Sequence, residues 1–201
     1  MQMEVDVREI PGPWELGYAL DRHVVRSEYT GDNEEGRPTF DTTYTEAGNA
    51  LHQLKYKQGW KLKHDIARAL NTHIMPKLPD IDLIVPIPAS TKRPRQPVDE
   101  IARALGERAG IRVGSHLIEM KDSSSVAPKL KSLATREEKD AVLKNRFKIN
   151  VAAPVPRGAN ILLLDDLFDT GATMSAVCTL LQSHPKVAKI YAAAVTKTGK
   201  T

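Results

Sequence analysis

The spacing of hydrophobic and polar positions changes along the chain, and this change divides it into two parts. Before residue 47, aromatic and β-branched residues lie on both sides of a stretch rich in turn-forming residues, 30–38. Such segments around glycine, proline and asparagine predict a β-hairpin or a small sheet. We therefore predict a β-rich cap over residues 1–46 and a separate core over residues 47–201.

The second part begins with two helices and continues as alternating strands and helices. Apolar residues recur at helical spacing over residues 47–54 and 62–74, with Gly59 between them. After residue 79, short apolar runs predict buried strands at 81–87, 116–120, 147–151, 161–165 and 187–195. The intervening stretches predict helices at 98–109, 134–145 and 172–182.

Strands that alternate with helices need crossover connections, and these favour parallel pairing. The predicted fold class is therefore α/β: a mainly parallel twisted sheet with flanking helices, plus a small N-terminal cap made of a β-hairpin and helical segments. The sequence contains no internal repeat and no low-complexity tract.

Length and composition limit the classes of protein that fit. The chain has 201 residues, of which 41% are hydrophobic and 27% charged, as in one globular domain with a small addition. No apolar stretch approaches the roughly 20 residues that span a bilayer, and no basic segment followed by an apolar run opens the chain. We therefore expect a cytoplasmic protein with no membrane partner. The one cysteine, Cys178, lies in an apolar helical pattern typical of a buried thiol.

Charge is distributed unevenly between the two parts. Residues 1–50 contain eleven acids and four bases, a net charge of −7, whereas residues 51–201 contain twenty-five bases and fourteen acids, a net charge of +11. The basic part is where an anionic ligand should bind. Charge alone does not separate a phosphate ligand from nucleic acid or from an ordinary solvated surface.

The most informative stretch is a buried strand that ends in two acids and continues into a polar turn. Four aliphatic residues, 161–164, precede Asp165 and Asp166, and the turn at residues 169–173 leads directly into a helix. In a parallel sheet the carboxyl ends of the strands form the usual ligand site, and a glycine-containing turn at a helix start suits a phosphate. Helix capping alone would explain the turn, but not the acid pair beside it.

This stretch resembles the signature with which type I phosphoribosyltransferases bind 5-phosphoribosyl 1-pyrophosphate. More narrowly, the chain resembles the ComF-like branch, which is associated with DNA uptake and with amidophosphoribosyltransferase-like proteins. Residues 51–57, residues 84–88 with the basic loop after them, and the basic segment before Phe147 extend the resemblance over residues 47–195. The zinc ribbon common at the N-terminus of that branch is lacking, because the sequence has no pair of cysteines.

The resemblance implies a role for each matching residue. Asp165 and Asp166 would bind the ribose hydroxyls, directly or through Mg²⁺, and Asp169 would act as an acid or base. The 5′-phosphate would lie on Asp169, Thr170, Gly171, Ala172 and Thr173. The pyrophosphate would lie on Ser90, Thr91, Lys92, Arg93 and Arg95. A flexible flap over the site would carry Lys121, Lys129 and Lys131.

Two of these regions keep an alternative. The flap segment lacks the Thr and Gln usual in the ComF-like branch and is equally typical of a plain surface loop. The N-terminal aromatic residues would stack on an acceptor base or form the small core of the cap itself; they are Trp14, Tyr18 and Tyr44.

Together these features predict a phosphoribosyltransferase of nucleotide metabolism. It would bind 5-phosphoribosyl 1-pyrophosphate and Mg²⁺, and transfer the phosphoribosyl group to a nitrogen nucleophile, an unidentified base or amine, with release of pyrophosphate. The alternative is a non-catalytic regulator with the same fold, or an accessory protein of DNA uptake or DNA defence that binds single-stranded DNA or a protein partner. A homodimer is compatible with either function.

Overall fold

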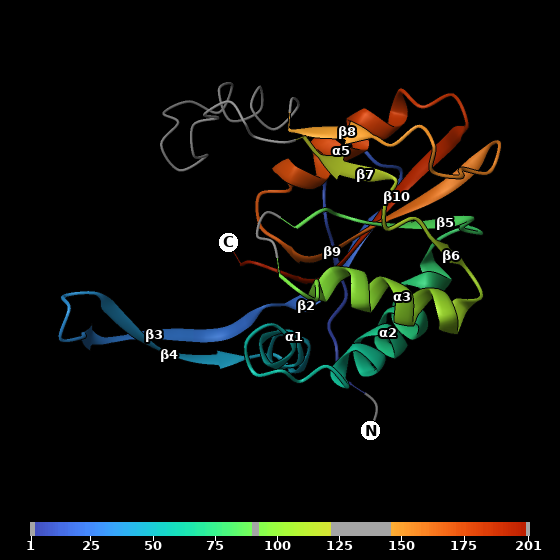
Figure 1. The fold of residues 1–201 in the computed structure, drawn as a ribbon. Coiled ribbons are helices and arrows are strands. Elements are labelled where there is room, and N and C mark those ends of the chain that lie inside the picture. The colour runs from blue at the N-terminus through green and yellow to red at the C-terminus, as the bar shows by residue number, and fades with distance from the viewer. Residues whose placement is uncertain (1–2, 90–92, 122–145, 200–201) are drawn as a thin grey trace.

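A six-stranded sheet lies at the centre of the computed structural model, which describes residues 3–89, 93–121 and 146–199 (Figure 1). The strand order is β1-β2-β10-β9-β5-β6, and every neighbouring pair is parallel except β1 with β2. The strands are β1 (Arg8–Glu9), β2 (Gly17–Arg22), β5 (Leu83–Pro86), β6 (Arg112–Val113), β9 (Ala159–Phe168) and β10 (Val187–Lys197). The predicted α/β fold class is confirmed.

Helices cover both faces of this sheet, as Figure 1 shows. On one face lie α1 (Glu46–Tyr56), α2 (Leu62–His73), the short 3₁₀ helix η1 (Met75–Lys77) and α3 (Pro97–Ala109). On the other lie α5 (Ala172–Gln182) and a two-stranded sheet of β7 (Ile118–Met120) and β8 (Phe147–Ile149). Alternate residues of β9 separate the two cores: Ile161 and Leu163 pack toward α5, whereas Leu162 and Leu164 pack toward α1, α2 and α3.

Local sequence signals set the helix ends. The Thr45 hydroxyl accepts a hydrogen bond of 3.0 Å from the Gly48 N–H, which caps the start of α1. Helix α3 begins with Pro97. Proline suits this position because an N–H group there would have no acceptor within the helix. The helix ends at Gly110, whose φ of 71° is left-handed. None of the helices in the described ranges is long and apolar enough to cross a membrane.

The connection between α3 and β7 differs from the prediction. A single strand over 116–120 was expected in the main sheet, but the pair Arg112–Val113 joins β5 there as β6, and Ile118–Met120 pairs with β8 in a separate sheet. Two residues form too short a strand to produce an apolar pattern, so the sequence does not show β6. The helix predicted at 134–145 lies outside the described residues.

The N-terminal residues contribute to the main sheet as well as to a projecting hairpin. Strand β2 pairs in parallel with β10, and β1 pairs with β2. Strands β3 (Val24–Asp32) and β4 (Pro38–Tyr44) form an antiparallel hairpin that extends away from the body of the molecule (Figure 1). Alternating polarity predicts the strands of this region but not the sheet that each strand joins.

Two isolated side chains singled out by the sequence are buried. The Trp14 indole packs edge-on against the Phe168 ring, with 6.1 Å between ring centroids, and its N–H donates to the Ile10 carbonyl at 3.0 Å. Trp14 therefore belongs to the core between the sheet and α5. Cys178 is also buried there, and burial raises the pKa of its thiol to about 12.

Candidate functional site

The candidate site lies where the parallel strands end. Asp165 and Asp166 lie near the carboxyl end of β9, and Asp165 is level with Ala194 of β10. Pro86, at the end of β5, pairs with Leu164, so the loop that follows β5 begins beside the acid pair. Strand β2 runs in the same direction, so the hairpin and α1 follow it from the same edge of the sheet.

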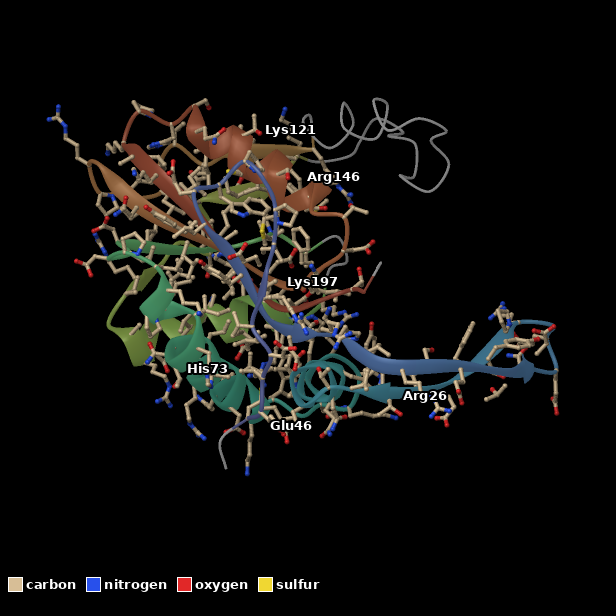
Figure 2. The ribbon with its side chains drawn as sticks, turned by 180° about the vertical axis from the view of Figure 1, so that it is seen from behind. Arg26, Glu46, His73, Lys121, Arg146 and Lys197 are labelled. Atoms are coloured by element: carbon tan, nitrogen blue, oxygen red, sulfur yellow. The ribbon has the colours of Figure 1, made fainter. Side chains whose placement is uncertain are left out.

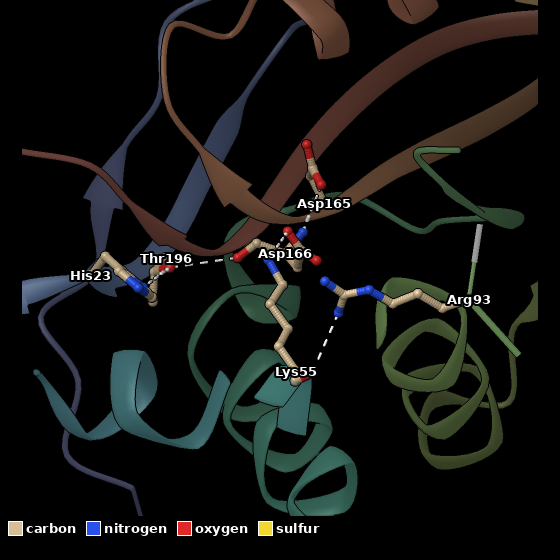
Figure 3. A network of polar contacts seen from close by, with 6 residues as sticks. All are labelled: His23, Lys55, Arg93, Asp165, Asp166 and Thr196. Carbon is tan, nitrogen blue, oxygen red and sulfur yellow. Dashed lines mark hydrogen bonds and ion pairs between the residues drawn. The ribbon is translucent and has the colours of Figure 1, made fainter. Parts of the chain in front are cut away.

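The two acids leave β9 on opposite sides of the sheet, as Figure 3 shows. Side chains of consecutive strand residues alternate between faces. Asp165 therefore follows Leu163 onto the α5 side, and Asp166 follows Leu164 onto the side of α1. The two carboxylates therefore lie in different surroundings, one on each side of the sheet.

On the α1 side, Asp166 forms an ion pair with Lys55, in the last turn of α1. The Lys55 Nζ atom is 2.8 Å from Asp166 Oδ1, and the two side chains are 17% and 19% exposed. Arg93 reaches the same place from the loop after β5: its Nη1 donates to the Lys55 carbonyl at 3.4 Å, and its guanidinium lies 5.6 Å from the centre of the Tyr56 ring. A carboxylate and two basic side chains thus meet at one point (Figure 3).

On the α5 side, Asp165 is held in an environment that disfavours its charge. Burial, and next the adjacent Asp166 carboxylate, raise the pKa of Asp165 to about 7. The Asp166 N–H, which donates to Asp165 Oδ1 at 2.8 Å, opposes this shift, as does the charge of Lys55. Asp165 therefore keeps its proton to a higher pH than an ordinary carboxyl group does.

Two adjoining hollows open beside the acid pair. The larger has a volume of about 290 Å³; its polar lining includes Lys55, Arg93, Arg146, Asp165 and Asp166, and its apolar lining includes Ile87, Met120 and Phe147. The smaller, of about 150 Å³, is formed by the turn at residues 169–173 with Phe168 and Met174. Asp165, Leu167 and Thr173 line both hollows, so a single extended ligand can occupy the two.

The turn between β9 and α5 has the form of an anion cradle. Gly171 caps α5 with a left-handed φ of 75°, and a Cβ atom there would lie 2.7 Å from the Phe168 ring. The Thr170 hydroxyl accepts a hydrogen bond of 3.4 Å from the Ala172 N–H, and Asp169 accepts one of 2.6 Å from the Thr198 hydroxyl. The first N–H groups of a helix have no partners within it and favour an anion.

Of the predicted pyrophosphate-binding residues that the structure describes, one lines the larger hollow and one does not. Arg93 lines the larger hollow. Arg95 instead pairs with Glu100 at 2.9 Å and lies over the Trp60 ring at 4.3 Å. Both of these contacts stabilise a guanidinium, and they hold Arg95 on α3 and the segment before α2. Ser90, Thr91 and Lys92 lie outside the described residues.

Of the predicted flap residues, the structure describes only Lys121. The Lys121 side chain is exposed, and its backbone N–H donates to the Arg146 carbonyl at 2.9 Å (Figure 2). Arg146, not Lys121, lines the larger hollow. Lys129 and Lys131 lie outside the described residues.

A series of ring contacts runs from the base of the hairpin to Tyr56, beside Arg93. Tyr44 stacks on His52 at 5.0 Å between centroids, and His52 lies 5.2 Å from Tyr56. At the other end His23 meets Tyr44 edge-on at 5.4 Å, and its Nδ1 is 3.0 Å from the Thr196 hydroxyl. Burial, and next the Lys55 charge, lower the pKa of His23.

Of the aromatic residues that the sequence offers for stacking on a base, Tyr44 has an aromatic neighbour within the protein. Tyr18 lies elsewhere, under the Lys77 ammonium at 5.8 Å.

Lys55 and Arg146 are site residues that the sequence did not reveal. Lys55 falls within the residue 51–57 segment, but helical spacing marks it only as a partly exposed position beside buried Leu54. Nothing in the spacing shows that this side of α1 meets the end of β9. Arg146 precedes a three-residue strand with no recognisable motif.

Comparisons with known proteins concern the fold. No protein-family model matches this sequence, and no curated protein matches it. A solved allosteric regulatory enzyme of purine biosynthesis is similar at a TM-score of 0.50 and 11% identity, over 81% of this chain and 34% of that chain. At this identity the likeness shows a shared fold, and it says nothing of activity.

Two solved adenine phosphoribosyltransferases are also similar. The enzyme from Trypanosoma brucei, in complex with AMP, pyrophosphate and ribose-5-phosphate, has a TM-score of 0.49 and 13% identity over 95% of this chain and 74% of that chain. The enzyme from Thermoanaerobacter pseudethanolicus has a TM-score of 0.43 and 16% identity over 85% of this chain and 95% of that chain.

Proposed function

We propose that this chain is a phosphoribosyltransferase. It binds 5-phosphoribosyl 1-pyrophosphate and transfers the phosphoribosyl group to a nitrogen nucleophile, a base or an amine. The observation that carries the proposal is the pair of adjoining hollows at the ends of the parallel strands, one lined by a phosphate cradle and the other by two acids and three bases. The ComF-like motifs make that branch our proposed place for the chain within the family.

We propose that the two hollows hold different parts of the substrate. The 5′-phosphate lies in the cradle at residues 169–173, and the ribose lies between Asp165 and Asp166. The pyrophosphate then extends into the larger hollow toward Arg93 and Arg146. Guanidinium groups bind phosphate oxygens through two parallel hydrogen bonds, and this suits a pyrophosphate leaving group.

The reaction breaks the bond between ribose C1 and the pyrophosphate oxygen, and forms a bond from C1 to the nucleophilic nitrogen. The bonding electrons leave with pyrophosphate, whose charge the basic side chains stabilise. Positive charge that develops on the ribose is stabilised by the neighbouring carboxylates. The nitrogen loses its proton to Asp169 or to solvent.

Mg²⁺ would bind at this site together with the substrate's phosphate groups rather than on protein side chains alone. The described residues contain no cluster of three histidine, cysteine or acidic side chains that could hold a metal ion, and Asp166 is already paired with Lys55. Mg²⁺ commonly binds through one or two carboxylates together with substrate phosphates. We therefore propose that Mg²⁺ reaches the site on the pyrophosphate, and we assign it no step.

Isothermal titration with 5-phosphoribosyl 1-pyrophosphate tests ligand binding directly. We expect the wild type to bind, and the double variant Asp165→Asn/Asp166→Asn to lose binding while keeping its fold. The matched control is Glu34→Gln/Glu35→Gln, which removes another adjacent acid pair on the exposed hairpin turn and should bind normally. Absence of heat from the wild type at millimolar ligand would contradict the proposal.

Pyrophosphate release separates catalysis from binding alone. We expect release when a panel of nucleobases and amines is added to the protein with its sugar pyrophosphate. Binding without release from any acceptor would favour the non-catalytic regulator. Salt-dependent retention of single-stranded DNA, also without release, would favour the DNA-uptake or DNA-defence accessory protein.

A further inference from the structure

Lys55 occupies the position from which a ligand or a cation would approach Asp166. Its ammonium lies 2.8 Å from the carboxylate, and both side chains line the larger hollow while being less than one-fifth exposed. An ion pair inside a candidate ligand site differs from one on the outer surface, because any cation that binds there meets the ammonium first.

The backbone of α1 fixes where this ammonium comes from. Leu51 and Leu54 are fully buried against the core that contains Leu164, so the inner face of the helix is set by packing. The Lys55 carbonyl accepts the hydrogen bond from Arg93, which connects the end of α1 to the loop after β5. The ammonium is therefore presented by a packed helix (Figure 3).

Two adjacent carboxylates need a nearby positive charge, and Lys55 supplies it. Asp165 and Asp166 repel one another, and burial strengthens the repulsion. A divalent ion at this pair would have to displace the Lys55 ammonium or bind beside it against its charge. The described residues offer no third carboxylate or histidine to offset that cost.

We propose that Lys55 is the resident counter-cation of Asp166, and that the chain consequently binds its phosphorylated ribose without a divalent ion at the acid pair. The identity of the sugar ligand rests on the proposed function, whereas the effect of Lys55 on metal binding does not. Lys55 acts as a positioning residue: through its ion pair it holds the Asp166 side chain oriented toward the ribose hydroxyls.

The first test measures Mn²⁺ binding to the protein without any sugar. Lys55→Met should bind Mn²⁺ at least about tenfold more tightly than the wild type. Lys55→Arg, which keeps the positive charge, should bind as weakly as the wild type. The matched control is Lys63→Met, because Lys63 pairs with Glu100 at 2.5 Å and has similar exposure, 22% and 19%, outside both hollows. It should leave Mn²⁺ affinity unchanged.

The second test measures ribose 5-phosphate binding with Mg²⁺ and with a chelator. The wild type and Lys63→Met should bind equally well in both conditions. Lys55→Met should lose about tenfold in affinity in the chelator and recover it with Mg²⁺. Circular dichroism melting of each variant checks that it is folded, and Lys55→Gln replaces Lys55→Met if the latter does not fold.

The outcomes separate the two proposals. Equal Mn²⁺ affinity in the wild type, Lys55→Met and Lys55→Gln would overturn the role of Lys55, and so would wild-type sugar binding that requires Mg²⁺. Absence of ribose 5-phosphate binding in every protein and condition would overturn the proposed function, while the Mn²⁺ comparison would still decide whether Lys55 excludes a divalent ion.

Discussion

Gly171 illustrates how one residue shapes the turn that we propose binds the 5′-phosphate. Its left-handed φ of 75° is unfavourable for other residues, and a Cβ atom would lie 2.7 Å from the Phe168 ring. Gly171→Ala should therefore destabilise the fold by about 1–3 kcal/mol and weaken ribose 5-phosphate binding. Urea unfolding and calorimetric titration measure the two effects.

The matched control is Gly36→Ala in the hairpin turn. Gly36 has a similar φ of 69°, but an added Cβ would meet no atom within 4 Å. This substitution should show the backbone strain alone and leave ligand binding intact. Equal loss of binding in both variants would contradict the cradle assigned to Gly171.

Asp165 makes stability depend on pH in a definite direction. Its pKa is raised from an ordinary value of 3.8 to about 7, so between these values the unfolded chain releases a proton that the folded chain keeps. Unfolding is then favoured increasingly as pH rises through this window, and the loss is complete above pH 7. Urea unfolding at pH 5 and pH 8 should show that the wild type loses stability relative to Asp165→Asn, by about 1 kcal/mol or more.

A substitution elsewhere provides the comparison for this pH effect. Asp41→Asn on the exposed strand β4 changes the net charge equally, but lies far along the chain from the acid pair. It should follow the wild-type pH dependence. A parallel loss of stability in the wild type and Asp165→Asn would show that Asp165 does not cause the effect.

At the residue scale, the site residues that the sequence predicts best are those that follow one another along the chain. The run from Ile161 to Thr173 contains the buried strand, the acid pair and the turn in one stretch, so the structure brings them together as expected. Lys55 and Arg146 reach the site from distant segments, and spacing carries no record of that meeting. Arg95 shows the converse: it lies in the predicted loop, but Glu100 and Trp60 hold it elsewhere.

The β3–β4 hairpin is an element whose place the sequence did not fix. Its turn residues predict a hairpin, but Tyr29 and Phe40 are 59% and 55% exposed, and the ribbon extends away from the body (Figure 1). The described residues that line the two hollows all come from other segments. The hairpin therefore adds little to the walls of the site.

Shortening this hairpin tests that separation. Residues 29–40 can be replaced by Asn-Gly, because Glu28 pairs with Asp41 and a two-residue turn suits such a pair. We expect the shortened protein to fold and to bind ribose 5-phosphate within about twofold of the wild type. A large loss of affinity, measured by titration calorimetry in a protein that still melts cooperatively, would show that the distal hairpin takes part in binding.

Elements were predicted best where their patterns are long. The helix at 172–182 agrees with α5 because its apolar positions continue over three turns. The two-residue strands β1 and β6 have no such pattern, and β2 resembles any strand of a hairpin. Strand partners depend on pairings across the whole chain, which local alternation does not encode.

At the scale of the molecule, parallel pairing gathers the site at one edge. Strands β2, β10, β9 and β5 run in the same direction, so the segments that follow them start side by side. The end of β9 supplies the acids, the loop after β5 supplies Arg93, and the helix that follows β2 and the hairpin supplies Lys55. Topology thus explains how the acids, Arg93 and Lys55 come together from three distant parts of the sequence.

The alternation of Asp165 and Asp166 also has a mechanical consequence. One carboxylate belongs to the layer of α5 and the other to the layer of α1, α2 and α3. A sugar bound by both carboxylates would link the two layers across the end of the sheet. Neither layer could then move away from the sheet without releasing the ligand. Ligand binding would then slow amide hydrogen exchange in both α1 and α5, although these helices lie on opposite sides of the sheet and far apart in the chain.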